Sequence, residues 1–251
     1  MYLRRNIDEQ LAIWRLEKQG KPLLIRGARQ VGKSTAVRHL ASQFNHFLEV
    51  NFEEQRQVHK LFEGDLDPHQ LCDNLSLLYN IPIEPGKTLL FFDEIQACIP
   101  AISSLRFFYE KYPDLHVIAA GSLLEFALAD VPSFGVGRVR SMFVYPLSFD
   151  EFLQASREDF LLDAKKKAGI GLPLQEPIHQ KLVGLLKRFL ILGGMPEVLA
   201  TYVQTKDFSR CSQVLDDLIT SLRADFSKYR SHVPYLRISE IFDAVVQQAG
   251  G

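Results

Sequence analysis

The chain of 251 residues is long enough for one large domain, or for a core domain followed by a smaller one. Apolar residues make up 47% of it and charged residues 24%, which excludes a disordered chain and predicts a folded core. The formal net charge of −1 excludes a chain-wide positive field that would attract nucleic acid or an anionic membrane.

Three scattered cysteines and the N-terminal sequence indicate in which cellular compartment the protein is expected. Cys72, Cys98 and Cys211 form no Cys-x-x-Cys pair, so buried thiols are expected rather than disulfides or zinc ligands. No apolar run approaches roughly 18 residues, and the N-terminus lacks the apolar segment of a signal peptide. We therefore expect a cytoplasmic protein with no membrane contact.

Strand and helix patterns alternate over the first 148 residues. An amphipathic helix at 7–18 precedes the first strand. Apolar or β-prone runs predict five strands, at residues 22–27, 46–53, 87–96, 115–122 and 140–148. Helical patterns lie between them, at residues 34–44, 55–80 (interrupted near 63–70), 101–112 and 122–129. This alternation predicts a parallel sheet covered on both faces.

After Pro146 the strand patterns stop and helical periodicity takes over. It recurs at residues 148–156, 177–192, 197–203 and 207–229. A linker rich in Gly, Pro and Lys is predicted at 165–177, where Lys165 to Lys167 are more typical of a solvated surface than of phosphate-backbone contacts. We predict four parts: an N-terminal helix at 1–20, an α/β core at 21–148, a helical subdomain at 149–233 and a final segment at 234–251.

A glycine-rich loop joins the first predicted strand to the next helix. It reads Gly27-Ala28-Arg29-Gln30-Val31-Gly32-Lys33-Ser34-Thr35, and its first eight residues match G-x-x-x-x-G-K-[ST]. The two glycines allow successive N–H groups to point at a phosphate. Lys33 is expected to reach the β- and γ-phosphate oxygens, and the Ser34 hydroxyl to bind Mg²⁺. A strand before and a helix after the loop favour a nucleotide-phosphate site over an incidental turn.

Two acids end the third predicted strand. Asp93 is expected to hold Mg²⁺ through water, and Glu94 to polarise a water in line with the γ-phosphate. An Asp-Glu pair can also form a plain strand-end turn, but the upstream loop favours catalysis. Small-molecule kinases need no such base, and the sequence lacks the N-K-x-D guanine reader of GTPases.

Polar residues also end two neighbouring predicted strands. Because parallel strands end at the same edge, Ser122 is expected beside the γ-phosphate, where it could sense that group. The alternative is that Ser122 caps the helix at 122–129. Asn51 ends the second strand and is a candidate for holding Glu94 inactive until a partner binds.

Six segments resemble, in this order, those of a prokaryotic family of ATP-binding proteins. They are RGARQVGKST, FLEVNFE, LLFFDEIQ, AAGSLLEF, GRVRSMFVYPLSFDEFL and GGMPEVL. The family is the AAA-type group AAA_14, usually followed by a DUF4143 region. The resemblance implies a P-loop NTPase fold, a three-layer α/β/α sandwich with strand order 5-1-4-3-2, and ATP and Mg²⁺ as cofactors. It also makes Arg138 a candidate γ-phosphate contact, in cis or across a subunit interface; Arg140 is the alternative, and a plain surface charge is the third interpretation.

The same resemblance extends to the helical half. GGMPEVL (193–199) is expected to form a helix–turn–helix corner, in which Pro196 starts the second helix. Family members usually continue through a winged-helix-like segment and a nuclease-like domain, so residues 234–251 are expected to begin a truncated winged-helix-like segment. A homo-oligomer, and DNA or protein bound through the missing region, are partners that the resemblance allows.

Two functions remain open at this point. The first is a Mg²⁺-dependent ATPase whose turnover drives a conformational switch. The alternative is a nucleotide-gated binding module with little turnover, which recognises DNA or a protein. Glu94 discriminates between them, because a pure binding module need not keep a catalytic base. A small-molecule kinase is disfavoured, since no lid with paired arginines is visible in the sequence.

Overall fold

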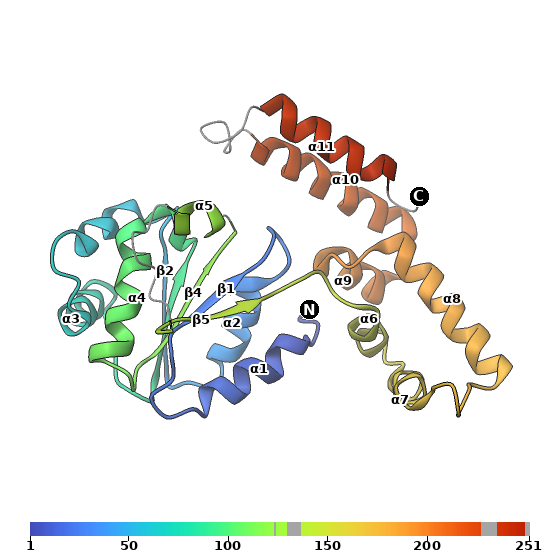
Figure 1. Ribbon diagram of the computed structural model, residues 1–251, viewed down its shortest axis with the longest axis horizontal. Coiled ribbons are helices and arrows are strands. Elements are labelled where there is room, and N and C mark those ends of the chain that lie inside the picture. Colours follow the sequence, from blue (N-terminus) through green and yellow to red (C-terminus); the bar gives the residue numbers. More distant parts are fainter. Residues whose placement is uncertain (123, 130–136, 227–234, 249–251) are drawn as a thin grey trace. The chain divides into compact units, whose positions relative to one another are not determined.

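The computed structural model describes the chain except for residues 123, 130–136, 227–234 and 249–251 (Figure 1). The chain divides into two compact units, Met1–Gln154 and Ala155–Gly251. This division places most of α6 (Phe149–Ala155) with the α/β core, whereas the sequence analysis assigned residues from 149 onward to the helical subdomain.

A five-stranded parallel sheet forms the centre of the first unit. Its strands are β1 (Leu23–Arg26), β2 (His46–Asn51), β3 (Thr88–Asp93), β4 (His116–Gly121) and β5 (Arg140–Phe143). They lie in the order β2-β3-β4-β1-β5, and each neighbouring pair is parallel. From the other edge this is 5-1-4-3-2, so the predicted fold and strand order are confirmed.

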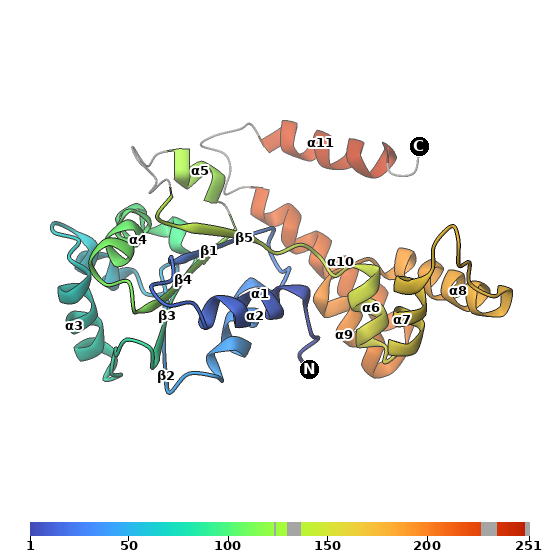
Figure 2. The same ribbon diagram turned by 60° about the horizontal axis from the view of Figure 1, so that its bottom comes forward.

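Helices cover both faces of this sheet (Figures 1 and 2). In chain order they are α1 (Asn6–Arg15), α2 (Lys33–Ala41), the 3₁₀ helix η1 (Arg56–Phe62), α3 (Pro68–Tyr79), the short η2 (Ile95–Ala97), α4 (Ile99–Lys111) and α5 (Leu124–Ala129). α1 and α2 pack on one face, and η1, α3 and α4 pack on the other.

The strand β3 shows why both faces are covered. All six of its residues are buried, as a central parallel strand requires. Successive side chains point to opposite faces, so Phe91 joins the cluster that contains Trp14 of α1. Phe92 lies on the other face against Phe62 and Phe108, with ring centroids 5.6 and 6.0 Å from its own.

The strand register sets which residues meet at the carboxyl edge of the sheet. Arg26 pairs with Gly121, and Asn51 pairs with Asp93. The loop after β1 and the residue after β4 therefore lie side by side, and Asn51 lies beside Asp93 on the neighbouring strand. This edge holds most of the residues that the sequence analysis selected.

The second unit is helical. Its helices are α7 (Asp159–Lys167), α8 (Glu176–Leu192), α9 (Pro196–Thr205), α10 (Phe208–Asp225) and α11 (Tyr235–Gln248). Gly193 ends α8 at φ +71° and Pro196 opens α9, which gives the expected corner. Lys165 to Lys167 form the last turn of α7 rather than part of a linker. Lysines are favourable there because they face the negative end of the helix dipole.

Two sequence expectations concern the chain as a whole. Cys72, Cys98 and Cys211 are buried free thiols. Within the described ranges, no helix combines the length and apolar character needed to cross a lipid bilayer.

Candidate functional site

The loop from Gly27 to Gly32 connects β1 directly to α2. Gly27 has φ +149°, and a Cβ atom built on it would lie 2.1 Å from the carbonyl oxygen of Val144. The approach is this close because β5 runs beside β1, and the N–H of Val144 donates to the carbonyl oxygen of Arg26 at 2.8 Å. The first glycine of the motif is thus required by packing as well as by backbone conformation.

Replacement of Gly27 by alanine is expected to lower the free energy of unfolding by about 3 kcal/mol or more, since a positive φ and an overlap with backbone both oppose the methyl group. Gly86→Ala is the matched control: its φ is +72°, but nothing lies within 4 Å of the added Cβ. The control should lose only about 1–2 kcal/mol. Urea unfolding of both variants measures the difference, and equal losses would contradict the packing argument.

Lys33 opens α2 with its side chain folded back over the loop. The ammonium donates to the carbonyl oxygens of Gly27 at 3.0 Å and Ala28 at 2.8 Å, and the residue is buried. Gly32, at the N-cap, makes no side-chain cap. An anion bound at the start of α2 would face the first N–H groups of the helix, where the helix dipole favours negative charge. The Lys33 ammonium is thus a buried cation beside a loop whose backbone could surround a phosphate group. Residues 27–32 are called the phosphate-type loop below.

Ser34 and Asp93 meet at the edge of the sheet. The Ser34 hydroxyl donates to Asp93 Oδ1 at 3.0 Å, and the N–H of Glu94 donates to the same oxygen at 3.1 Å. Asp93 is buried. Burial raises the pKa of its carboxyl above the ordinary value; the neighbouring Glu94 and Glu49 carboxylates act in the same direction, and the Ser34 hydrogen bond opposes them. A hydroxyl and a buried carboxylate are oxygen ligands that fit Mg²⁺.

The raised pKa of Asp93 predicts that Asp93→Asn stabilises the ligand-free protein at pH 7, by the order of 1 kcal/mol. The folded-state pKa lies above the unfolded one, so ionisation of Asp93 costs stability as pH rises through that range. Asparagine removes this cost and can still accept from Ser34. The gain should vanish below about pH 4, where both states of the parent are protonated.

Urea unfolding of the parent and Asp93→Asn from pH 3.5 to 7 checks this prediction. A parent that is more stable than the variant at pH 7 would contradict it.

Glu94 turns the chain sharply after β3. Its backbone is left-handed, at φ 48° and ψ 43°, and its carboxylate accepts a hydrogen bond from the Gln96 side-chain nitrogen at 2.6 Å. The Gln96 side-chain oxygen is buried and has no hydrogen-bond partner among the described residues. It also lies 2.2 Å from where a Cβ on Gly121 would be. Gln96 is therefore wedged between Glu94 and the end of β4.

Asn51 does not make the contact that the sequence analysis expected. Its side-chain oxygen accepts from the N–H groups of Glu53 at 3.0 Å and Glu54 at 3.2 Å, which closes the turn after β2. The hydrogen bond to the Glu94 carboxylate comes from Gln96 instead. A switch role for Asn51 remains a prediction that would require this turn to open.

Ser122 lies where the sequence analysis placed it, directly after β4. Gly121 pairs with Arg26, so Ser122 is next to the start of the phosphate-type loop. Its hydroxyl oxygen is buried and has no hydrogen-bond partner within the described part of the chain. The sensing role stays a prediction.

Arg138 and Arg140 lie at the wrong edge for a phosphate contact within the same subunit. β5 runs parallel to β1, and Arg140 pairs with Leu23 at its start. At about 3.3 Å per residue, Arg140 at the start of β5 is about 13 Å along the strand direction from Val144, which borders the loop, and Arg138 lies in the turn before β5. Arg138 forms an ion pair with Glu110, and Arg140 with Glu17. This position argues against a γ-phosphate contact within the same subunit, and the role of Arg138, or of Arg140 in its place, stays a prediction.

The structure adds Arg38, which the sequence analysis did not select. It lies one turn after Ser34 on α2 and makes two hydrogen bonds to the Glu49 carboxylate, at 2.9 and 2.6 Å. One of its nitrogens is also 3.9 Å from Asp93 Oδ2. The spacing of four residues from Ser34 was the available signal, because such residues share one helix face.

The family comparison agrees with this geometry. Residues 19–153, more than half of the chain, match the family model AAA_14, an AAA domain. The chain belongs to the AAA_14 family. Residues 183–251 match the model DUF8612, a domain of unknown function, and not the expected DUF4143 region.

A solved structure shows the same fold as this AAA_14 protein. The chain is similar to the Walker-type ATPase PABY2304 of Pyrococcus abyssi, with a TM-score of 0.57, 18% identity, and coverage of 93% of this chain and 77% of that chain. It is more distantly similar to the ORC2 protein of Aeropyrum pernix, with a TM-score of 0.43, 13% identity, and coverage of 64% and 52%. No curated protein matches the sequence. At this identity, the likeness to PABY2304 shows the fold alone.

Proposed function

We propose that this AAA_14 protein binds Mg·ATP at the carboxyl edge of its sheet and hydrolyses it to ADP and phosphate. The observation that carries the proposal is the 3.0 Å hydrogen bond between Ser34 and Asp93, with Glu94 next in the chain. It joins the end of the phosphate-type loop to the end of β3 in a single polar site. Turnover would drive a conformational switch in the chain.

The loop and the start of α2 hold the phosphates in this proposal. N–H groups of residues 27–35 donate to phosphate oxygens, and the Lys33 ammonium pairs with the β and γ groups. Ser34 and Asp93 would hold Mg²⁺, the latter through water, and the bound ion would neutralise charge on the phosphates. Adenine is proposed as the base because the guanine-reading motif is absent from the sequence.

Glu94 supplies the base. Its carboxylate takes a proton from a water as the water oxygen attacks the γ-phosphorus, and the bond from that phosphorus to ADP breaks. Gln96 orients the carboxylate through the 2.6 Å hydrogen bond. Ser122 would contact the γ-phosphate. An Arg138 contact would have to come from a second subunit and would therefore need a homo-oligomer; DNA or protein partners are likewise proposals.

The test is phosphate release and nucleotide binding by the parent and Lys33→Ala, with Lys87→Ala as the control. Lys87 is an exposed lysine in a surface ion pair with Glu84. Lys33→Ala should weaken nucleotide binding at least about 100-fold, because the buried cation at the phosphates is lost. Lys87→Ala should match the parent. Binding without turnover in the parent would favour the nucleotide-gated binding module, and no binding at all would overturn the proposal.

A further inference from the structure

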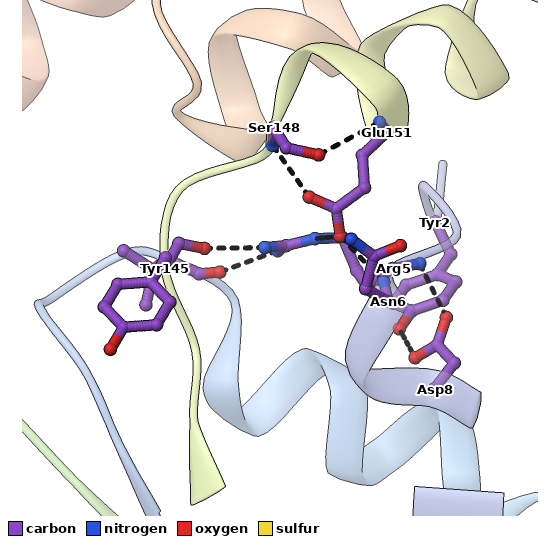
Figure 3. A network of polar contacts seen from close by, with 8 residues as sticks. Tyr2, Arg5, Asn6, Asp8, Tyr145, Ser148 and Glu151 are labelled. Atoms are coloured by element: carbon purple, nitrogen blue, oxygen red, sulfur yellow. Dashed lines mark hydrogen bonds and ion pairs between the residues drawn. The ribbon is translucent and has the colours of Figure 1, made fainter. Parts of the chain in front are cut away.

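A buried arginine stands immediately before α1, in a segment to which neither the loop motif nor the strand-end acids draw attention. The guanidinium of Arg5 donates to the carbonyl oxygen of Val31 at 2.9 Å and to that of Tyr145 at 2.6 Å. Its Nε donates to Glu151 Oε1 at 3.1 Å. Figure 3 shows the guanidinium between Tyr145 and Glu151. One side chain thus joins the N-terminal segment, the phosphate-type loop, the chain after β5, and α6.

The Val31 contact bears on the direction of a loop N–H group. A trans peptide unit is planar, so its C=O and its N–H point in opposite directions. The N–H that shares a peptide unit with the Val31 carbonyl belongs to Gly32. By holding that carbonyl toward itself, Arg5 turns the Gly32 N–H away, toward the other side of the loop.

This peptide unit needs an external constraint. Gly32 has φ +91°, and glycine tolerates several backbone conformations at little cost. Gln30, one residue before Val31, is also left-handed, at φ +61°. A loop of this kind can adopt alternative peptide orientations unless a donor holds its carbonyl, and Arg5 provides that donor.

The hydrogen bonds of the Arg5 guanidinium to Val31, Tyr145 and Glu151 are called the clamp below, and further hydrogen bonds fix its position. Glu151 Oε1 also accepts from the N–H of Asn6 at 2.7 Å, and Oε2 accepts from the N–H of Ser148 at 2.7 Å (Figure 3). The N–H of Arg5 donates to Asp8 at 2.8 Å, which fixes the backbone that carries the guanidinium. An arginine fork can reach two carbonyls and a carboxylate at once, whereas a lysine ammonium on a flexible stem cannot match that geometry.

We propose that Arg5 is a positioning residue for the phosphate-binding loop. It holds the Val31 carbonyl toward its own guanidinium. In the ligand-free protein, the Gly32 N–H therefore already points at the position that a nucleotide phosphate would occupy. This inference rests on the proposed nucleotide binding by residues 27–35.

The test compares nucleotide affinity among four variants of the 251-residue chain, with titration of Mg·ATP and Mg·ADP well below their unfolding temperatures. Arg5→Met/Glu151→Gln removes the clamp without leaving a buried unpaired charge. Glu151→Gln alone leaves Arg5 able to hold Val31. Arg4→Met is the matched control, because Arg4 is the adjacent arginine and its exposed side chain forms a surface ion pair with Glu9.

The double variant should bind at least about tenfold more weakly than Glu151→Gln, because a preorganised phosphate donor is lost. Arg4→Met should bind like the parent. Arg5→Lys, the conservative variant, keeps the charge and is expected to recover only part of the affinity. It is also the variant to use if the double variant does not fold.

A purely structural role would lower the unfolding temperature of the Arg5 variants and leave the affinity of the folded protein unchanged. Binding by the double variant, or by Arg5→Lys if the double variant does not fold, within twofold of the parent would overturn the inference. A parent that binds no nucleotide would instead overturn the proposed function on which the inference rests. The two failures are therefore distinguishable.

Discussion

Replacement of Glu94 by glutamine is expected to slow phosphate release about 10²- to 10⁴-fold while Mg·ATP still binds. Glutamine has the shape of glutamate but cannot take a proton from water. Its side-chain oxygen can still accept the hydrogen bond that Gln96 now donates to Glu94 at 2.6 Å, so the turn after β3 should persist. Single-turnover phosphate release and nucleotide affinity, measured on the same preparation, separate the chemical step from binding.

The control for this prediction is Glu84→Gln, the same change at an exposed carboxylate that pairs with Lys87 on the surface. It should release phosphate at the parental rate. If Glu94→Gln turns over at the parental rate, the base is another group and the proposed mechanism is wrong. If it loses nucleotide affinity as well, Glu94 contributes to binding rather than to the chemical step alone.

Replacement of Glu151 by alanine is expected to lower the free energy of unfolding by about 3–5 kcal/mol. The change leaves the buried guanidinium of Arg5 without its counter-ion, and the N–H groups of Asn6 and Ser148 without their acceptor. Burial makes the loss large, because unpaired charges and donors are costly away from water.

The chain offers a matched control for this second prediction in Glu9→Ala. The Arg4–Glu9 and Arg5–Glu151 ion pairs have the same nitrogen–oxygen distance, 3.1 Å. Both side chains of the first pair are well exposed, whereas those of the second are 7% and 6% exposed. Exposed pairs contribute about 0–1 kcal/mol. Urea unfolding of the two variants checks the contrast, and similar losses would contradict the role assigned to burial.

The chemistry at the carboxyl edge was predictable because each signal is local in sequence. An apolar run followed by a glycine-bracketed loop and Lys33-Ser34 predicts a strand, a phosphate-type turn and a helix. A second apolar run that ends in Asp93-Glu94 supplies the acids. Parallel strands end at one edge, so these groups were expected to meet, and the 3.0 Å contact between Ser34 and Asp93 agrees.

The same rule argues against Arg138 as a cis contact. Arg138 precedes β5, so it belongs to the amino edge of a parallel sheet, whereas the loop follows β1 at the carboxyl edge. That candidate role was implied by the family resemblance alone, not by the direction of the strand. Element ends were also predicted imprecisely: the fifth strand was expected to reach 148, but β5 ends at Phe143.

By itself, then, the sequence determined the five strands of a parallel sheet, the loop and the two acids, because apolar periodicity and contiguous motifs are short-range properties; the strand order was implied only by the resemblance to the family. Only the tertiary structure decided that Gln96 rather than Asn51 holds Glu94, since that choice depends on a left-handed turn and on the side-chain space beside Gly121. It also decided that Arg5 meets Val31 and Glu151, which lie 26 and 146 residues away. No local pattern encodes such pairs, because the partners of a buried charge are brought together only by the packing of the folded chain.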